Sequence, residues 1–182
     1  MYRILCTLTV GVLLCSCTVT DNQKKKLADE LRLFREVAIT FPDNLLAKRY
    51  DEQAPDISLL NRPLKMVVYV NREGCGSCKI TGLLPVYQFI LENRHVEKFG
   101  MVVILSPSHI KLSDDYLEQF RLRQTFFFDL DGSFERLNPH LPENERFHTF
   151  LLDENNKVVL VGNPVRNTKL KNLYLAELNK YN

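Results

Sequence analysis

The chain has 182 residues, which gives room for one ordinary domain and a short extension. Its content of 45% apolar and 25% charged residues is typical of a soluble globular protein and excludes a disordered or fibrous one. The formal net charge is only +2, and residues 24–26 form the only compact basic cluster, so nothing indicates a nucleic-acid partner.

The first residues have the pattern of an export signal. Arg3 is followed by 12 mostly apolar residues, 4–15, whereas a helix that spans a bilayer needs about 20. Residues 14–17, Leu-Cys-Ser-Cys, resemble the lipobox of bacterial lipoproteins. The resemblance implies a lipoprotein-type signal peptide over residues 1–16 and a lipid on Cys17. An ordinary cleaved signal with an incidental cysteine is the alternative.

Between the signal and the main domain, residues 17–42 should supply the lipidated cysteine, a tether and a helix. The polar residues 18–23 are expected to form the tether. Pro42 should stop the helix, and weak periodicity predicts irregular chain over residues 43–63. The helix itself is predicted by apolar residues at spacings of three and four, namely Leu27, Leu31, Phe34, Ala38 and Phe41.

Short β-branched runs predict two buried strands, at residues 66–70 and 101–105. A helix from Cys75 to about Arg94 should connect them. A second helix should begin at Asp114 with Ser113 as its cap, and a third strand should cover residues 125–129.

The last third of the chain predicts a hairpin and a final helix. Asp131-Gly132 is a hairpin-type turn signal, and residues 147–152 and 157–161 should pair as antiparallel strands. Thr168 is expected to cap the last helix, and residues 126–128, three phenylalanines, are expected to lie in the core. This order of elements predicts an α/β fold, a central mixed sheet with helices on both faces.

The cysteines carry the main chemical signal. Of the five, Cys6 and Cys15 would leave with the signal and Cys17 would carry lipid, so a Cys-x-x-Cys pair remains in an oxidising compartment. Cys75 should open a helix, where free N–H groups and the helix dipole lower a thiol pKa from about 8.5 towards roughly 3.5–7.5. Cys75 is therefore the expected attacking thiolate and Cys78 the resolving thiol.

Two charged residues flank the cysteine pair, and two alternative roles for the pair, a zinc site and a structural disulfide, have less support in the sequence. Lys79 adds positive charge beside the thiols, and Glu73 opposes it. Structural zinc would need two further ligands at matching spacing, which the sequence lacks. A purely structural disulfide would close a four-residue loop, worth roughly 2 kcal/mol, which makes it a poor staple.

The strand, the Cys75-Gly76-Ser77-Cys78 motif and the helix after it resemble the thioredoxin-like superfamily, and residues 149–159 resemble its closing hairpin. The match extends over about residues 64–182. With the anchor, the chain is similar to membrane-tethered thioredoxin-like lipoproteins of the bacterial envelope. The resemblance implies a thioredoxin-like domain over residues 43–182.

Four positions depart from the pattern of that superfamily. Gly74 stands where a tryptophan is usual, and Tyr69 stands where thioredoxins have a buried aspartate, so proton handling should differ. Pro85 lies ten residues after the first cysteine rather than eight. His148 replaces the cis-proline before the hairpin.

His148 is open to three interpretations. It is a solvent-facing loop residue, a group that tunes Cys75 through a hydrogen bond, or a ligand that joins both thiolates around a soft metal ion. The Phe147–His148 bond should be trans, because a cis bond before a non-proline residue costs about 2.5–4 kcal/mol. His140 lies in a loop long enough to approach the cysteines, and His95 and His109 fall in predicted surface stretches.

The leading functional hypothesis is an enzyme, a thiol–disulfide oxidoreductase that acts on exported protein cysteines and needs no cofactor. A copper-binding module that uses Cys75, Cys78 and His148 is the first alternative, and a redox-inert interaction domain is the second. The expected location is the cell envelope, with the domain outside the cytoplasm and anchored by lipid to a bacterial membrane. The expected partners are exported protein thiols or disulfides and a membrane-bound redox protein.

Overall fold

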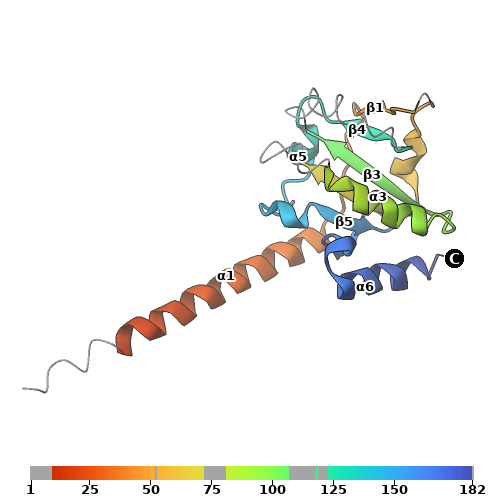
Figure 1. Ribbon diagram of the computed structural model, residues 1–182. Helices are drawn as coiled ribbons and strands as arrows, with labels where there is room; N and C mark the ends of the chain where they lie inside the picture. The colour runs from red at the N-terminus through yellow and green to blue at the C-terminus, as the bar shows by residue number, and fades with distance from the viewer. Residues whose placement is uncertain (1–9, 52, 72–80, 107–117, 119–122, 182) are drawn as a thin grey trace, which may run out of the picture.

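The computed structural model describes residues 10–51, 53–71, 81–106, 118 and 123–181, without the side chains of residues 10–20. A six-stranded mixed sheet forms the centre of the domain (Figure 1). From one edge to the other the strands are β1 (Leu46–Lys48), β4 (Phe126–Phe128), β3 (Phe99–Leu105), β2 (Leu64–Val70), β5 (Thr149–Leu152) and β6 (Val158–Val161).

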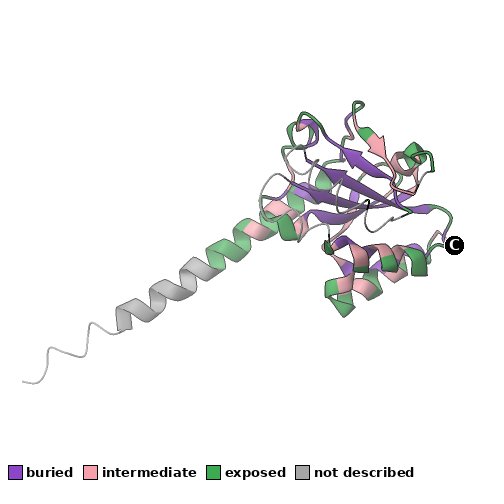
Figure 2. Ribbon diagram, turned by 45° about the horizontal axis from the view of Figure 1, so that its top comes forward, coloured by how far each residue is buried: buried purple, intermediate pink, exposed green. Residues whose placement is uncertain are grey.

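Strands β2 and β3 form the middle of the sheet and are parallel, with Leu64 opposite Phe99 and Val70 opposite Leu105. Every residue of both strands is buried, as the purple strands of Figure 2 show. Parallel strands covered on both faces are continuous apolar runs, which is why the sequence pattern predicted them. Strand β4 is parallel to β3, while β1, β5 and β6 pair antiparallel with their neighbours.

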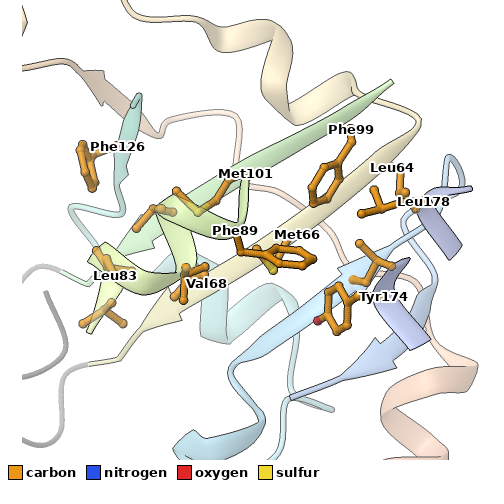
Figure 3. Close-up of a cluster of buried hydrophobic side chains, with 14 of the residues drawn as sticks. Leu64, Met66, Val68, Leu83, Phe89, Phe99, Met101, Phe126, Tyr174 and Leu178 are labelled. Atoms are coloured by element: carbon orange, nitrogen blue, oxygen red, sulfur yellow. The ribbon is translucent and has the colours of Figure 1, made fainter. Parts of the chain in front are cut away.

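Helices cover both faces of the sheet, as the sequence predicted. On one face, α3 (Leu83–Glu92) and α6 (Thr168–Leu178) pack on the even-numbered residues of β2 (Figure 3). Phe89 and Tyr174 meet there edge to face at 6.1 Å. On the other face, the end of α1 (Val10–Glu36) and α5 (Ser133–Leu137) pack on the odd-numbered residues.

The phenylalanine run of β4 confirms the prediction of a core strand. Phe126 and Phe128 belong to the core under α3, whereas Phe127 belongs to the core under α1 and α5. All three are at most 1% exposed, because side chains alternate across a sheet that is covered on both faces. The predicted hairpin is also confirmed, with Phe150 opposite Val161.

The N-terminal helix differs from the prediction at both ends. It begins at Val10 and includes the expected tether, and it ends at Glu36 instead of continuing to Phe41 (Figure 1). The chain leaves the helix because tertiary hydrogen bonds hold it extended. The amide of Ile39 donates to the carbonyl of Asn156 at 2.9 Å, and Thr40 exchanges two bonds of 2.8 Å with the Asn138 side chain.

Residues 43–63 are more regular than predicted. They contain β1 and the 3₁₀-helix η1 (Ile57–Asn61), which Asp56 caps by accepting a hydrogen bond from the amide of Ser58. Both elements are too short for a hydrophobic period to show in the sequence.

Two turn predictions were wrong in detail. Gly132, with a φ of 71°, leads into α5 rather than a hairpin, because the Asp129 carboxylate accepts from the amides of Ser133 and Phe134 at 2.9 and 3.0 Å. The cap of α6 is Asn167, whose side chain accepts from the amide of Leu170, and not its neighbour Thr168. The predicted start of a helix at Cys75 and the helix capped by Ser113 lie outside the described residues.

The buried carboxylate of Asp129 gives a prediction for stability. Asp129→Ala leaves the Phe134 amide without its acceptor and the Ser133 amide with Asp131 alone, and we expect a loss of about 1–3 kcal/mol in the free energy of unfolding. Asp129→Asn keeps one acceptor oxygen, so its loss in the free energy of unfolding should be smaller than that of Asp129→Ala. Urea titration measures the loss, with the exposed Glu135→Ala on the same helix as the control. A loss below about 0.5 kcal/mol for Asp129→Ala would refute this account of α5.

Candidate functional site

The predicted redox residues are bracketed by two described segments. Glu73, Cys75, Cys78 and Lys79 lie outside the described residues, which stop at Asn71 and resume at Thr81. The site is therefore defined by the two chain segments that flank these residues, the end of β2 at Val70 and the N-cap of α3 at Gly82.

A groove of about 730 Å³ lies at the carboxyl end of β2. Val70, just before that segment, and Gly82, just after it, both line the groove. The carboxyl ends of parallel strands are where α/β sheets bind ligands. The groove is therefore the candidate site.

Three parts of the fold line this groove. Strand β2 and helix α3 supply mainly apolar side chains: Val68, Tyr69, Val70, Leu83 and Val86. The segment that enters β5, including the 3₁₀-helix η3 (Glu145–Phe147), supplies Glu145, Arg146, His148 and Thr149. The segment after β6, including the 3₁₀-helix η4 (Pro164–Arg166), supplies Asn163, Arg166, Asn167 and Leu170.

The backbone of His148 joins β2 to the segment that enters β5. Its carbonyl accepts a hydrogen bond of 2.8 Å from the amide of Tyr69, and its amide donates to the carbonyl of Glu145 at 3.1 Å. No cis peptide bond occurs among the described residues, so the Phe147–His148 bond is trans, as expected.

The side chain of His148 is buried, with an exposed fraction of 5%, so the interpretation as a solvent-facing loop residue is wrong. Its Nε2 lies 2.7 Å from the carbonyl oxygen of Pro142. Because a carbonyl only accepts, Nε2 carries the proton and Nδ1 is the acceptor of the neutral ring. The imidazole also packs against the ring of Tyr69 at 5.5 Å. The ring is therefore held in one tautomer and one orientation.

This tautomer limits how His148 can bind a metal ion. With Nε2 donating to Pro142, only Nδ1 has a lone pair for a ligand bond. The described residues contain no group of three or more His, Cys, Asp or Glu side chains arranged to hold a metal. The proposed copper ligands other than His148 lie outside those residues.

Tyr69 occupies the place of the buried aspartate of thioredoxins and offers no carboxylate. Its side chain is 4% exposed and packs against Phe134, with the ring centroids 4.9 Å apart. Among the described residues that line the groove, His148 is the one histidine and Glu145 is the one residue with a carboxylate side chain.

Neither His140 nor His95 lines the groove. His140 packs near Phe34, 6.1 Å between ring centroids, and burial lowers the pKa of His140. The same loop supplies the Pro142 carbonyl that bonds to His148, whereas the cysteines that the loop was expected to approach lie outside the described residues. His95 is exposed after α3, as predicted, and His109 lies outside the described residues.

Sequence reasoning missed the polar side chains of the groove and the role of Pro142. Arg146 lies just before the predicted hairpin, and Asn163, Arg166 and Asn167 just after it. The one signal in the sequence for these residues is their position. The two ends of a hairpin that pairs with β2 lie near the carboxyl end of β2.

No described helix is long and apolar enough to cross a membrane.

Comparison with known proteins supports the fold. Neither a family model nor a curated protein matches the sequence. A protein from Chlorobium tepidum assigned as thiol:disulfide interchange protein DsbE has a similar structure, with a TM-score of 0.54 and 20% identity over 78% of this chain and 96% of that one. A protein from Bacteroides thetaiotaomicron assigned as a protein disulfide isomerase has a TM-score of 0.53 and 13% identity, over 80% and 89%. The chain therefore has a thioredoxin-like fold.

Proposed function

We propose that this chain is a thiol–disulfide oxidoreductase that exchanges disulfides with exported proteins through Cys75 and Cys78. The observation that carries the proposal is the groove at the end of β2, whose lining includes both chain flanks of the cysteine pair. A substrate in this groove would contact the described chain on both sides of the cysteine pair, at Val70 and Gly82. The activities in the names of the two similar structures belong to those proteins, and they agree with the proposal.

The exchange conserves electrons and sulfur atoms. The Cys75 thiolate attacks one sulfur of a client disulfide, forming a mixed disulfide and releasing the other client sulfur as a thiolate. The Cys78 thiolate then attacks the sulfur of Cys75 and releases the second client thiol. Two electrons have passed to the client, and Cys75 and Cys78 form a disulfide. The same steps in reverse oxidise a client dithiol.

The charges around the pair set how readily the first thiolate forms. Lys79 favours the Cys75 thiolate, and Glu73 disfavours it. We assign His148 as the group that receives the Cys75 proton at Nδ1. The imidazolium formed would keep its Nε2–H bond to the Pro142 carbonyl, and its Nδ1–H would donate to the Cys75 thiolate. An imidazolium beside a thiolate lowers the pKa of that thiol.

The anchor sets where the reaction takes place. With lipid on Cys17, the domain would stand outside the cytoplasm in the cell envelope, near a membrane-bound redox partner. Helix α1 continues from this position and is hydrogen-bonded to the domain at Glu30, where the Glu143 amide donates to the Glu30 carboxylate. The 13 residues 17–29, at about 1.5 Å each, would make a stalk of roughly 20 Å. A tether of this kind raises the effective concentration of the domain near membrane partners.

The roles of the two cysteines predict an asymmetry in trapping. Cys78→Ser should accumulate mixed disulfides with client proteins, because nothing resolves them, whereas Cys75→Ser should accumulate none. Cys75 should also be alkylated faster than Cys78 at neutral pH. Non-reducing electrophoresis and mass spectrometry of alkylated thiols measure both effects. Trapping by Cys75→Ser instead would reverse the assignment, and trapping by neither variant would favour the redox-inert alternative.

The proposed role of His148 predicts a shift in a pH profile. His148→Ala and His148→Pro should move the pH dependence of Cys75 alkylation to higher pH, by about one unit, because the thiolate loses its positively charged neighbour. His95→Ala, an exposed histidine outside the groove lining, should leave the profile unchanged. An unchanged profile in both His148 variants would remove the tuning role. Loss of tight Cu(I) binding in both would support the copper-binding alternative.

The anchor gives a prediction for the full chain in cells. The wild-type protein should incorporate a fatty-acid label and sediment with membranes, and Cys17→Ala should abolish both. Cys15→Ala, which changes the neighbouring cysteine, should keep the label and serves as the matched control. A wild-type protein that is unlabelled and fully soluble would refute lipidation.

A further inference from the structure

We infer that the groove selects client segments with acidic residues beside the reacting cysteine. This inference rests on the proposed exchange function and names its substrate class. Its basis is a pair of arginines, Arg146 and Arg166, that reach the groove from the two flanks of the β5–β6 hairpin.

Neither arginine is used within the part of the fold that the structure describes. Both side chains are exposed at the groove, and neither guanidinium forms a hydrogen bond or ion pair with the described part of the chain. Three other arginines of the domain are engaged: Arg49 binds the carboxylate of Asp51, Arg136 binds that of Asp131, and Arg62 donates to the carbonyl of Glu97. The exposed side chains of Arg94 and Arg123 also have no bond to the described residues, but they do not line the groove, so position in the groove is what distinguishes Arg146 and Arg166. Arg146 and Arg166 thus leave their donors for an outside acceptor.

The backbone under each arginine is fixed. Asn144 caps η3 by accepting from the amide of Arg146 at 3.1 Å. Asn163 caps η4 by accepting from the amide of Val165 at 3.0 Å, and the neighbouring Pro164 is buried. Only the two side chains need to be ordered when a ligand binds, which reduces the entropic cost of binding.

The chemistry of the groove matches an acidic peptide. A guanidinium binds a carboxylate through two parallel N–H···O bonds, which gives both charge and geometric fit. Val68, Val70 and Leu83 supply an apolar surface for the side chains between the acids. Glu145 is the one acid among the described lining residues, so these carry two positive charges and one negative charge. Because the net charge of the chain is only +2, the attraction is local to this groove.

Binding of two matched peptides tests the inference without chemistry. Each labelled peptide has a central serine in place of the client cysteine and differs only in having Glu or Lys two residues to either side. Fluorescence anisotropy should show the wild-type protein binding the glutamate peptide roughly threefold to tenfold more tightly. The charge-reversed variant Arg146→Glu/Arg166→Glu should reverse the order. The preference should shrink between about 10 mM and about 500 mM NaCl, because salt screens exposed charges.

A control variant separates local from overall charge. Arg35→Glu/Lys98→Glu makes the same change in net charge at two exposed positions outside the groove lining and should keep the wild-type preference. The inference is overturned if the wild-type protein binds both peptides equally, or if the control variant reverses the order as well. It is also overturned if Arg146→Glu/Arg166→Glu weakens both peptides to the same extent.

A separate measurement on the wild-type protein distinguishes a failure of the proposed function. The reduced protein should exchange with hydroxyethyl disulfide, which carries no charge, and form its own disulfide. Exchange without a peptide preference would keep the function and remove the inference. A peptide preference without exchange would remove the function and leave a groove that binds acidic peptides.

Discussion

Strand β2 pairs with a strand on each side, and each of its two faces packs into a hydrophobic core. Its seven residues pair with the parallel strand β3 along their whole length and with the antiparallel strand β5 over the first part. The pairing with β5 is extended by the hydrogen bond from the amide of Tyr69 to the carbonyl of His148. That bond places the segment before β5 beside the carboxyl end of β2, after which the sequence continues to the cysteine motif. The position of the groove follows from this pairing.

A trans peptide with a histidine side chain stands here in place of a cis-proline. The consequence is chemical as well as geometric, because the segment now brings a buried imidazole to the groove. The Pro142 carbonyl holds Nε2 at 2.7 Å and fixes which nitrogen can accept a proton. Tyr69, at the place of the thioredoxin aspartate, supplies no carboxylate. The proposed proton acceptor thus comes from the hairpin side of the site rather than from β2 itself.

The sequence predicted the central elements well because their patterns are strong. Strands β2 and β3 are uninterrupted apolar runs, and the β5–β6 hairpin has a polar turn between two apolar runs. Tertiary contacts decided what sequence reasoning missed. The end of α1 depends on Asn156 and Asn138, which are about a hundred residues away in the chain. No local pattern shows that Asp129 would turn a predicted hairpin into the start of α5.

The candidate site was predictable only in part, for a similar reason. The Cys75–Cys78 motif is visible as spacing, whereas the side chains that line the groove come from segments that meet only when the sheet forms. His148 was noticed because it departs from a known pattern, yet its burial and its bond to Pro142 depend on a loop six residues upstream. Arg146 and Arg166 flank the hairpin and are ordinary surface residues by sequence alone.

The reduction potential of the Cys75–Cys78 pair tests the central claim most directly. The full chain is equilibrated in glutathione or dithiothreitol buffers, and the oxidised fraction is read from the alkylated mass. We expect a single two-electron transition between about −120 and about −270 mV, the range of exchange catalysts, and none in Cys75→Ser. A disulfide that is reduced only below about −300 mV would be structural and would contradict the account, as would a pair that forms no disulfide at any potential.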